Sequence, residues 1–333
     1  MEGFSIISEY AEDEISQITV QDQIKYIALI GMGASIANTK ALLCFAELKK
    51  PIIFLDSLER DVLDESLVYL DRSNTLFVAI SKSGTTDEVL KITQYIIEHK
   101  IKNPLIYYVS DNKDTDLAKF ILHVANGHYI RYEKSLSGRF SILQNASILP
   151  LYLAGANLAA LTNKIKEATS KAREDSLAEF ISSNYAKNRN IIVLSVHNKK
   201  LVGLSEWIKQ IIAESLGKNS FGITPVISIG SICEHSQLQL YLDGPDDKMY
   251  YIIPYLPQVG DNNLSQSHFI HAESFRKVLE NAGRPVYAEK EAELSIIPKW
   301  MMTICAIAEQ NNINPYTQDA VEKLKKLLHK SAA

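Results

Sequence analysis

The strongest constraint on the fold is an alternation of short apolar runs with amphipathic stretches along the whole chain. In the first half the runs are Tyr26–Gly31, Ile52–Asp56, Thr75–Ser81 and Leu105–Ser110. In the second half they are Ile191–Val196, Pro225–Ile229, Tyr250–Ile253 and Val286–Ala288. Such alternation is typical of βαβ units built on parallel sheets. The pattern therefore predicts an α/β fold of two doubly wound α/β/α domains with largely parallel sheets.

Helical stretches connect these runs and mark the divisions of the chain. Asp87–His99 follows one predicted strand, Ser141–Leu161 predicts a long apolar helix, and Pro315–Lys330 predicts a charged C-terminal helix. A charged stretch, Asn163–Glu179, separates the halves. We predict a first domain over residues 1–170, a second over 171–312 and a C-terminal helix over 313–333.

Composition limits the partners and the location of the chain. The formal net charge of −4 provides no global field that would attract nucleic acid or an anionic membrane. Its three cysteines are widely spaced and match neither a disulfide framework nor a zinc motif. The N-terminus is acidic, and no run reaches the ~20 apolar residues needed to cross a bilayer. We therefore expect a cytoplasmic protein without nucleic-acid or membrane partners.

A hydroxyl-rich loop follows the third predicted strand. Ser81–Thr86 (SKSGTT) places four hydroxyl groups, Lys82 and a glycine directly before the helix that Asp87 opens. A helix N-terminus offers unpaired N–H groups and the positive end of its dipole, so we predict a phosphate site here. Thr85-x-x-Glu88 also matches a capping box, which would account for one threonine and not for the other hydroxyls.

A second glycine-containing turn, Gly31–Ser35 (GMGAS), follows the first predicted strand. With Asp56 at the end of the next strand, it resembles part of a dinucleotide-binding fingerprint. Ile36, however, stands where that fingerprint has its third glycine, which close helix–sheet packing requires. Binding of a nicotinamide dinucleotide is therefore kept as an alternative hypothesis.

The stretch Leu204–Leu216 predicts a helix with a buried face. Its apolar residues recur at helical spacing, and Gly217 follows as a C-terminal cap. Glu214 then lies in the last turn, where the helix dipole disfavours the charged carboxylate and should raise its pKa. We interpret Glu214 as a candidate general base, and the alternative is a solvated surface glutamate.

Four other positions carry groups suited to proton transfer or metal binding. His235 follows a predicted strand, and both a functional and a structural histidine fit the pattern there. His268-x-x-His271 with Glu273 has the spacing of ligands on one helix face, although a polar face is the alternative because no third spaced ligand is evident.

Two cations complete the set of candidates. Arg139 precedes the predicted apolar helix, and the alternative is a surface arginine beside a capping box at Ser141-x-x-Gln144. Lys325 is one of several lysines of the charged tail, and the pattern alone does not distinguish it.

Together these segments resemble the glucose-6-phosphate isomerase family, whose members contain two sugar-isomerase (SIS) domains. Five motifs carry the resemblance in the family's order. They are SKSGTT (Ser81–Thr86), SGRFSILQNASILPLYLAG (Ser137–Gly155), AESLGK (Ala213–Lys218), GSICEHSQLQLYLDGPDDK (Gly230–Lys248) and NPYTQDAVEKLK (Asn314–Lys325).

The resemblance implies reversible isomerisation of glucose 6-phosphate and fructose 6-phosphate through a cis-enediol(ate), in glycolysis and gluconeogenesis. It implies no metal and no redox cofactor, because a fixed cation would stabilise the oxyanion. The substrate phosphate would be held by Ser81, Lys82, Ser83, Thr85 and Thr86.

The resemblance also assigns roles outside the phosphate loop. Glu214 would move the proton between C2 and C1, and Arg139 would stabilise the enediolate. His235 and Lys325 would assist opening of the sugar ring, and His235 would come from the neighbouring subunit of a homodimer. The remaining contacts would come from Gly33 and Ser35, which would line the sugar, and from Gln318, which would help to close the site.

The chain departs from the family pattern at three positions. Ala34 and Ser137 replace glycines, and Leu324 replaces the glycine that precedes the lysine. These changes bear on substrate preference and rate. The alternatives are an isomerase for another or mixed phosphosugar, such as mannose 6-phosphate, and a non-catalytic SIS-domain sensor of sugar phosphates.

Overall fold

The computed structural model describes residue 15 and residues 17–132, 137–171, 176–255, 263–321, 323–324 and 327. The chain divides into two compact units, Met1–Lys164 and Ile165–Ala333, and each is described by itself. Helix α7 (Leu158–Lys171) spans the boundary between the two units.

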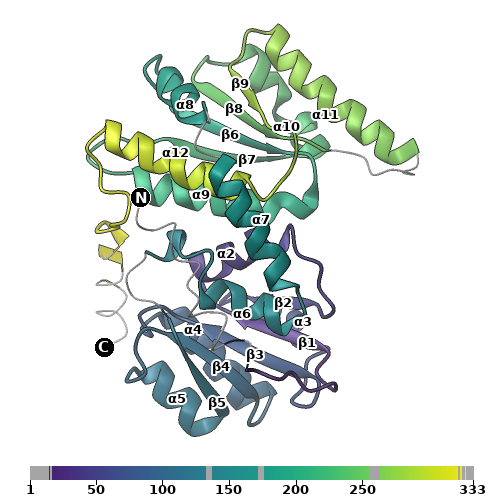
Figure 1. Cartoon of the computed structure of the whole chain (residues 1–333), viewed down its shortest axis with the longest axis vertical. Coiled ribbons are helices and arrows are strands. Elements are labelled where there is room, and N and C mark those ends of the chain that lie inside the picture. The colour runs from purple at the N-terminus through teal and green to yellow at the C-terminus, as the bar shows by residue number, and fades with distance from the viewer. Residues whose placement is uncertain are drawn as a thin grey trace. The chain divides into compact units, whose positions relative to one another are not determined.

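Unit 1 is a five-stranded parallel sheet with helices on both faces (Figure 1). In chain order its elements are β1 (Tyr26–Ile30), α2 (Ala34–Leu43), β2 (Ile52–Leu55), α3 (Arg60–Leu67), β3 (Thr75–Ile80), α4 (Asp87–Tyr95), a π-helical turn (Ile96–Lys100), β4 (Leu105–Ser110), α5 (Asp116–Val124), β5 (Asn126–Arg131), the 3₁₀ turn η3 (Gly138–Phe140) and α6 (Asn145–Leu153). The strand order β2-β1-β3-β4-β5 places β3 at the centre.

Both faces of the first sheet are buried. Alternate strand residues such as Ala28, Phe77 and Ile106 form a core with α3, α4 and α5. On the other face α6 packs against α2 and β1. All six residues of β3 are buried, which explains why its sequence TLFVAI is continuously apolar rather than alternating.

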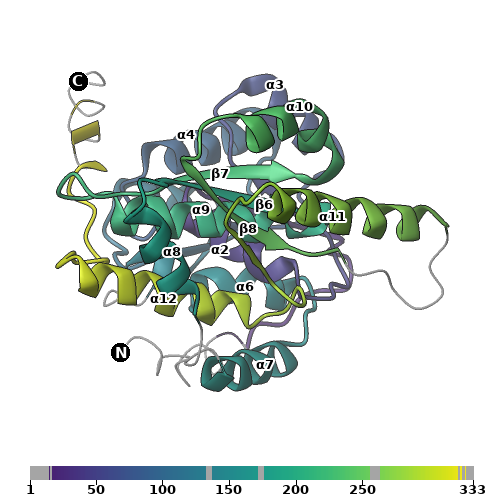
Figure 2. The same cartoon turned by 90° about the horizontal axis from the view of Figure 1, so that it is seen from above.

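Unit 2 contains a four-stranded parallel sheet in the order β7-β6-β8-β9. In chain order its elements are α8 (Leu177–Tyr185), β6 (Ile191–Val196), the 3₁₀ turn η5 (Lys199–Leu201), α9 (Val202–Leu216), β7 (Thr224–Ile229), α10 (Gly230–Asp243), β8 (Lys248–Ile253), α11 (Asn263–Asn281), β9 (Val286–Ala288) and α12 (Ile296–Gln310). Helices α10 and α11 share a core with β6 and β8 on one face. On the other, α9 packs on β6 and β7, and α12 lies along α8 and α9 (Figure 2).

The predicted α/β class with parallel sheets is confirmed, and the predicted strands match the observed ones to within two residues. The edge strand β5 was not predicted. Its sequence NGHYIR is mostly exposed or half-buried and has the polar composition of a loop, so no apolar run marks it. It forms because β4 leaves one side of its backbone unpaired, and β5 pairs with it in parallel.

The predicted single helix Ser141–Leu161 is wrong, since α6 and α7 are separate helices. Gly155, with φ +84°, ends α6 in the left-handed conformation. Its N–H donates to Tyr152 O at 2.8 Å, and the Ala156 N–H donates to Leu151 O at 2.9 Å. These two bonds form a Schellman motif, which satisfies the last carbonyl groups of α6 and stops the helix.

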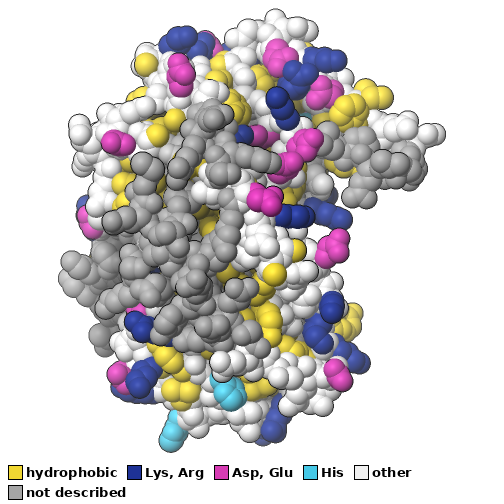
Figure 3. Space-filling view, viewed as in Figure 1, with side chains coloured by type: hydrophobic (Ala, Val, Ile, Leu, Met, Phe, Trp, Pro, Cys, Tyr) yellow, Lys and Arg dark blue, Asp and Glu magenta, His cyan; other side chains and the backbone are white. Residues whose placement is uncertain are grey.

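The C-terminal helix was also predicted to start too early. Residues 314–320 lie in turns, and helical residues are found only from Val321 onward among those that the structure describes. None of the helices in the described ranges combines the length and apolarity that crossing a bilayer demands. On the face shown in Figure 3, basic and acidic side chains lie interspersed within each unit.

Candidate active site

The hydroxyl-rich loop begins where the central strand β3 ends. Ser81 is buried, and its Oγ donates to Thr86 Oγ1 at 2.9 Å and accepts from the Thr86 N–H at 3.4 Å. Ser83 Oγ and Thr85 Oγ1 lie 2.8 Å apart, and both residues are exposed. The loop thus has a part-buried hydroxyl pair that fixes its shape and an exposed pair.

Gly84 allows the loop to turn tightly against the neighbouring strand. Its φ is +68°, a left-handed conformation that costs other residues free energy. A Cβ at this position would lie 2.5 Å from Thr115 Oγ1 and 2.6 Å from the Tyr108 hydroxyl. Backbone conformation and space both require glycine here.

Helix α4 starts directly after the loop. Its N-cap is Thr86, whose side chain makes no cap hydrogen bond, so the alternative capping box with Thr85 at the cap is wrong. The N–H groups of the first turn have no acceptors within the helix. Together with the exposed hydroxyls of Ser83 and Thr85, they can surround an anion such as phosphate.

Lys82 contacts the ring of an aromatic residue that no sequence motif marks. The Lys82 ammonium lies 5.6 Å from the centre of the Tyr132 ring. Tyr132 is buried, which raises its pKa to about 12 and keeps it neutral. Its hydroxyl hydrogen-bonds with Ser141 Oγ, which donates to Gly138 O at 2.6 Å. Tyr132 therefore links the loop to the turn that carries Arg139.

The glycine-containing turn Gly31–Ser35 lies at the same edge of the sheet, because β1 and β3 are parallel neighbours. Gly33 has φ +56° and is the N-cap of α2. The Asn38 amide donates to Gly138 O at 2.9 Å, and a Cβ added at Gly138 would lie 3.1 Å from that of Ala34. The sugar-lining turn predicted at Gly33 and Ser35 is thus packed against the arginine turn.

Arg139 belongs to the turn that Tyr132 and Asn38 contact. It lies in the turn η3 and is 0% exposed, so the alternative of a surface arginine is wrong. Ser141 does not cap the next helix either, since α6 has Gln144 as its N-cap. Burying a guanidinium is costly unless it is paired or hydrogen-bonded, and Arg139 does have such interactions.

The dinucleotide hypothesis fits this geometry poorly. Asp56, the candidate ribose ligand, instead pairs with Lys40 at 2.8 Å. Lys40 also lies 4.9 Å from the centre of the Phe54 ring. The carboxylate is therefore engaged within the unit.

In unit 2, Glu214 lies in the last turn of α9, as predicted. The side chain is half-buried, and its Oε1 accepts a hydrogen bond of 2.7 Å from the Gln210 amide one turn earlier. Gly217 follows as the C-cap. A neutral donor from the same helix thus helps to orient the carboxylate.

The C-terminal segment meets the end of α9. The Lys218 ammonium donates to Ser215 O at 3.0 Å and to Asn314 O at 2.6 Å. This contact brings the segment of Gln318, which is half-buried, to the same end of the unit as Glu214. Lys325 lies outside the residues that the structure describes.

His235 is found at the other edge of the second sheet. It is exposed on α10, which starts at the carboxyl end of β7, whereas Glu214 ends α9 at the amino edge. Glu214 and His235 also belong to helices on opposite faces of the sheet, so the two side chains are separated within unit 2. The structure therefore does not bring these two predicted site residues together in one unit.

The candidate metal ligands are engaged elsewhere. His268 contacts the backbone oxygen of His197, and Glu273 pairs with Arg276 at 2.8 Å. Within the described ranges, no group of three histidine, cysteine or acidic side chains is close enough to hold a metal ion.

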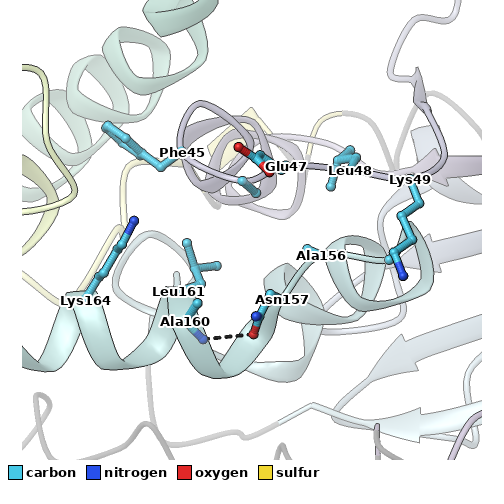
Figure 4. A pocket seen from close by; sticks show the side chains of 11 residues that line it. Phe45, Glu47, Leu48, Lys49, Ala156, Asn157, Ala160, Leu161 and Lys164 are labelled. Carbon is cyan, nitrogen blue, oxygen red and sulfur yellow. Dashed lines mark hydrogen bonds between the residues drawn. The ribbon is translucent and has the colours of Figure 1, made fainter.

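Unit 1 also contains a pocket of about 480 Å³ that is separate from the hydroxyl-rich loop (Figure 4). It lies between the segment after α2, including Glu47 and Lys49, and the start of α7, including Asn157 and Lys164. None of the predicted site residues lines it.

The chain is similar in sequence to known glucose-6-phosphate isomerases. No protein-family model matches the chain. It is 28% identical to a probable glucose-6-phosphate isomerase of Methanococcus maripaludis, over 91% of this chain and 77% of the relative. It is 27% identical to the glucose-6-phosphate isomerase of Methanocaldococcus jannaschii, over 90% of this chain and 82% of the relative.

A solved structure shares the fold. The crystal structure of a glucose-6-phosphate isomerase from Chlamydia trachomatis matches with a TM-score of 0.75 at 17% identity, covering 99% of this chain and 73% of that one. Each unit described above therefore has a counterpart in an architecture already known from experiment.

Proposed function

We propose that this chain, a member of the glucose-6-phosphate isomerase family, catalyses the reversible isomerisation of glucose 6-phosphate and fructose 6-phosphate. The proposal is supported by the hydroxyl-rich loop, which directly precedes the positive end of α4, and by the buried Arg139, whose turn is linked to that loop through Tyr132. These groups provide donors for a phosphate and a fixed cation for an oxyanion. Relatives of that name align over nine tenths of the chain.

The reaction assigns one task to each group. Ser81, Ser83, Thr85 and Thr86 hold the phosphate with Lys82. Glu214 takes the proton from C2 and returns it at C1 through a cis-enediol(ate), a transfer that needs one base and no external oxidant. The Arg139 guanidinium stabilises the enediolate oxygen, which preorganised cations do efficiently.

The remaining groups act before and around the proton transfer. His235 and Lys325 assist ring opening, Gly33 and Ser35 line the sugar, and Gln318 closes the site. A role in glycolysis and gluconeogenesis and a cytoplasmic location belong to the same proposal.

The proposed assembly is a homodimer in which each His235 serves the neighbouring subunit. Its support is the separation of Glu214 and His235 at opposite edges of the second sheet. Exposed apolar side chains also lie on the helices of the His235 face, among them Ile232 and Leu240 of α10 and Leu264 and Ile270 of α11. Such a surface suits an isologous contact between two copies.

Proton transfer in heavy water tests the function. The purified protein is incubated in D₂O with fructose 6-phosphate and a chelator, and NMR follows the products. Glucose 6-phosphate carrying deuterium at C2 is expected with the parent and with Glu206→Gln, a variant of an exposed residue of α9 that pairs with Lys209. No such product is expected with Glu214→Gln.

Mannose 6-phosphate in parallel tests the breadth of the substrate range. Its conversion at a comparable rate would replace the proposal with a mixed phosphosugar isomerase. Tight binding of the sugar phosphates without deuterium incorporation would contradict catalysis and favour the non-catalytic sensor.

A further inference from the structure

A group of ionisable side chains lies at the carboxyl edge of the second sheet, next to His235, and it includes the buried His197 and the largely buried Glu234. His197 follows β6, Glu234 lies in the first turns of α10, and His268 and His271 belong to α11. The side chains of His197 and Glu234 are 1% and 14% exposed. His197 Nδ1 and Glu234 Oε1 lie 3.5 Å apart.

Glu234 occupies a position where an apolar side chain would be expected. The residues of α10 that face the unit follow a helical stripe through Glu234, Leu238 and Tyr241, and the last two belong to the core. Burying a carboxylate in such a stripe costs free energy unless a partner compensates. Its partners here are His197 and, at 3.9 Å, His271 Nδ1.

The contact between Ser195 and His197 indicates which ring nitrogen of His197 carries the proton. Ser195 Oγ is 3.2 Å from His197 Nε2 and can donate to it, which leaves the proton of a neutral imidazole on Nδ1. Among the described residues, His197 Nδ1 and Glu234 Oε1 are both buried, and neither has a hydrogen-bond partner. The two atoms therefore face each other at 3.5 Å as a polar contact between buried groups and not as a hydrogen bond.

Burial, followed by the nearby His268, lowers the pKa of His197 to about 4, so its imidazole is neutral at neutral pH. Burial raises the pKa of the Glu234 carboxyl. Three histidines of other elements face Glu234, namely His197, which follows β6, and His268 and His271 of α11. His235 is its neighbour on α10, and Glu273 of α11 also faces His197.

We propose that Glu234, held by His197, is a positioning residue that fixes the direction of His235 for ring opening, an inference that rests on the proposed function. Consecutive helical residues point about 100° apart, so the orientation of one determines that of the next. In α10 only Gly230 and Tyr241 are fully buried. The turn between them is held to the unit by Glu234 and by the bond from the Ile229 N–H to Cys233 Sγ at 3.1 Å.

The activity test separates ring opening from binding. In Glu234→Leu we expect two rates to fall together by about tenfold. They are kcat for cyclic fructose 6-phosphate and the rate of glucose 6-phosphate anomerisation. A loss of this size is typical of a misplaced acid–base group. Inhibition by erythrose 4-phosphate, which cannot form a ring because its O4 carries the phosphate, should change less than twofold. Asp243→Asn, an exposed position on the same helix, should match the parent.

Glu234→Gln retains an acceptor oxygen and should keep more activity than the leucine variant. The acidic fall of kcat in the parent, caused by protonation of Glu234, should be absent in the glutamine variant. Thermal unfolding of both variants should stay close to that of the parent, since replacing a buried charge by a side chain of similar size is often neutral or stabilising.

An NMR titration of the histidine side chains decides the inference without turnover. In the full-length parent, the His235 imidazole signals, assigned with His235→Asn, should show a second step as Glu234 titrates, and that step should vanish in Glu234→Gln. Any of three results would overturn the positioning role. They are a His235 titration that is the same in the parent and in Glu234→Gln, ring opening in Glu234→Leu at the parent's rate, and a loss of erythrose 4-phosphate affinity in Glu234→Leu as large as the loss of ring opening. A parent that binds but does not convert fructose 6-phosphate would contradict the proposed function alone, because the titration still reports the coupling.

Discussion

The two units place their candidate functional groups in opposite ways. In unit 1 the phosphate loop, the Gly33 turn and the Arg139 turn are linked at one edge of the sheet. Tyr132 contacts Lys82 of the loop through its ring and hydrogen-bonds with Ser141, and Asn38 donates a hydrogen bond to Gly138. In unit 2, Glu214 and His235 lie at opposite edges. The difference is that unit 1 gathers its candidate groups at one edge of its sheet, whereas unit 2 keeps its two candidate groups apart.

The largest expected effect is the loss of turnover in Glu214→Gln. If unit 2 contributes chemistry and unit 1 contributes binding, kcat should fall by about 10³-fold, the range seen when a general base is removed. The inhibition constant of erythrose 4-phosphate should change little. Steady-state kinetics measure kcat and the inhibition constant, with Glu206→Gln as the control. A loss confined to affinity would contradict the assignment of chemistry to unit 2 and binding to unit 1.

The proposed dimer, in which unit 2 contributes Glu214 and His235 to two different sites, predicts complementation. Glu214→Gln and His235→Asn should each be nearly inactive as purified proteins. After co-refolding in equal amounts, mixed dimers contain one site with both residues intact, so activity should recover to about a quarter of the parent's. If both residues serve the same subunit's site, the mixture stays inactive.

The buried His197 predicts a pH dependence of stability that belongs to unit 2. Its pKa is lowered to about 4, so the folded state binds fewer protons than the unfolded state between pH 4 and 6.5. The free energy of unfolding should therefore be highest above pH 6.5 and should decrease as the pH drops toward 4, by at most about 3 kcal/mol.

The comparison of His197→Asn with His99→Asn tests this dependence, since His99 is exposed. Urea unfolding at pH 7.0 and pH 4.5 should show a smaller pH effect in the first variant than in the parent, and no change in the second. Equal pH effects in all three proteins would show that His197 is not the titrating group.

Gly84→Ala tests how tightly the loop of unit 1 is built. The variant should lose about 2 kcal/mol or more, because it adds a close contact with Thr115 and Tyr108 to the strain of a positive φ. Gly283→Ala is the matched control, since Gly283 has φ +69° but open space around it, and it should lose about 1 kcal/mol. Similar thermal shifts in the two variants would argue against close packing at the loop.

The smallest effect is expected from the exposed hydroxyls of the loop. Ser83→Ala combined with Thr85→Ala should raise KM and the inhibition constant of erythrose 4-phosphate by about 30-fold, since two lost hydrogen bonds to a charged group at about 1 kcal/mol each cost about 2 kcal/mol together. The parent's kcat should be retained. Ser66→Ala, at an exposed hydroxyl of α3, is the control, and a fall in kcat without weaker binding would assign these hydroxyls to the chemistry instead.

Local patterns were sufficient for the elements and for several of the candidate groups. The apolar runs predicted eight of the strands because buried parallel strands are continuously apolar. The loop Ser81–Thr86 and the position of Glu214 in the last helical turn followed from residues close together in the sequence. The break at Gly155 and the strand β5 were missed because a left-handed cap and an edge strand depend on what surrounds them.

The sequence by itself determined the fold class, the family resemblance and which residue types are available for phosphate binding and proton transfer. Only the tertiary structure decided which of them meet. It buried Arg139 beside the phosphate loop, placed Tyr132 under Lys82, paired Asp56 with Lys40 and set Glu234 against His197. The physical reason is that burial and pairing arise between segments far apart in the chain, whereas periodicity and capping are properties of neighbouring residues.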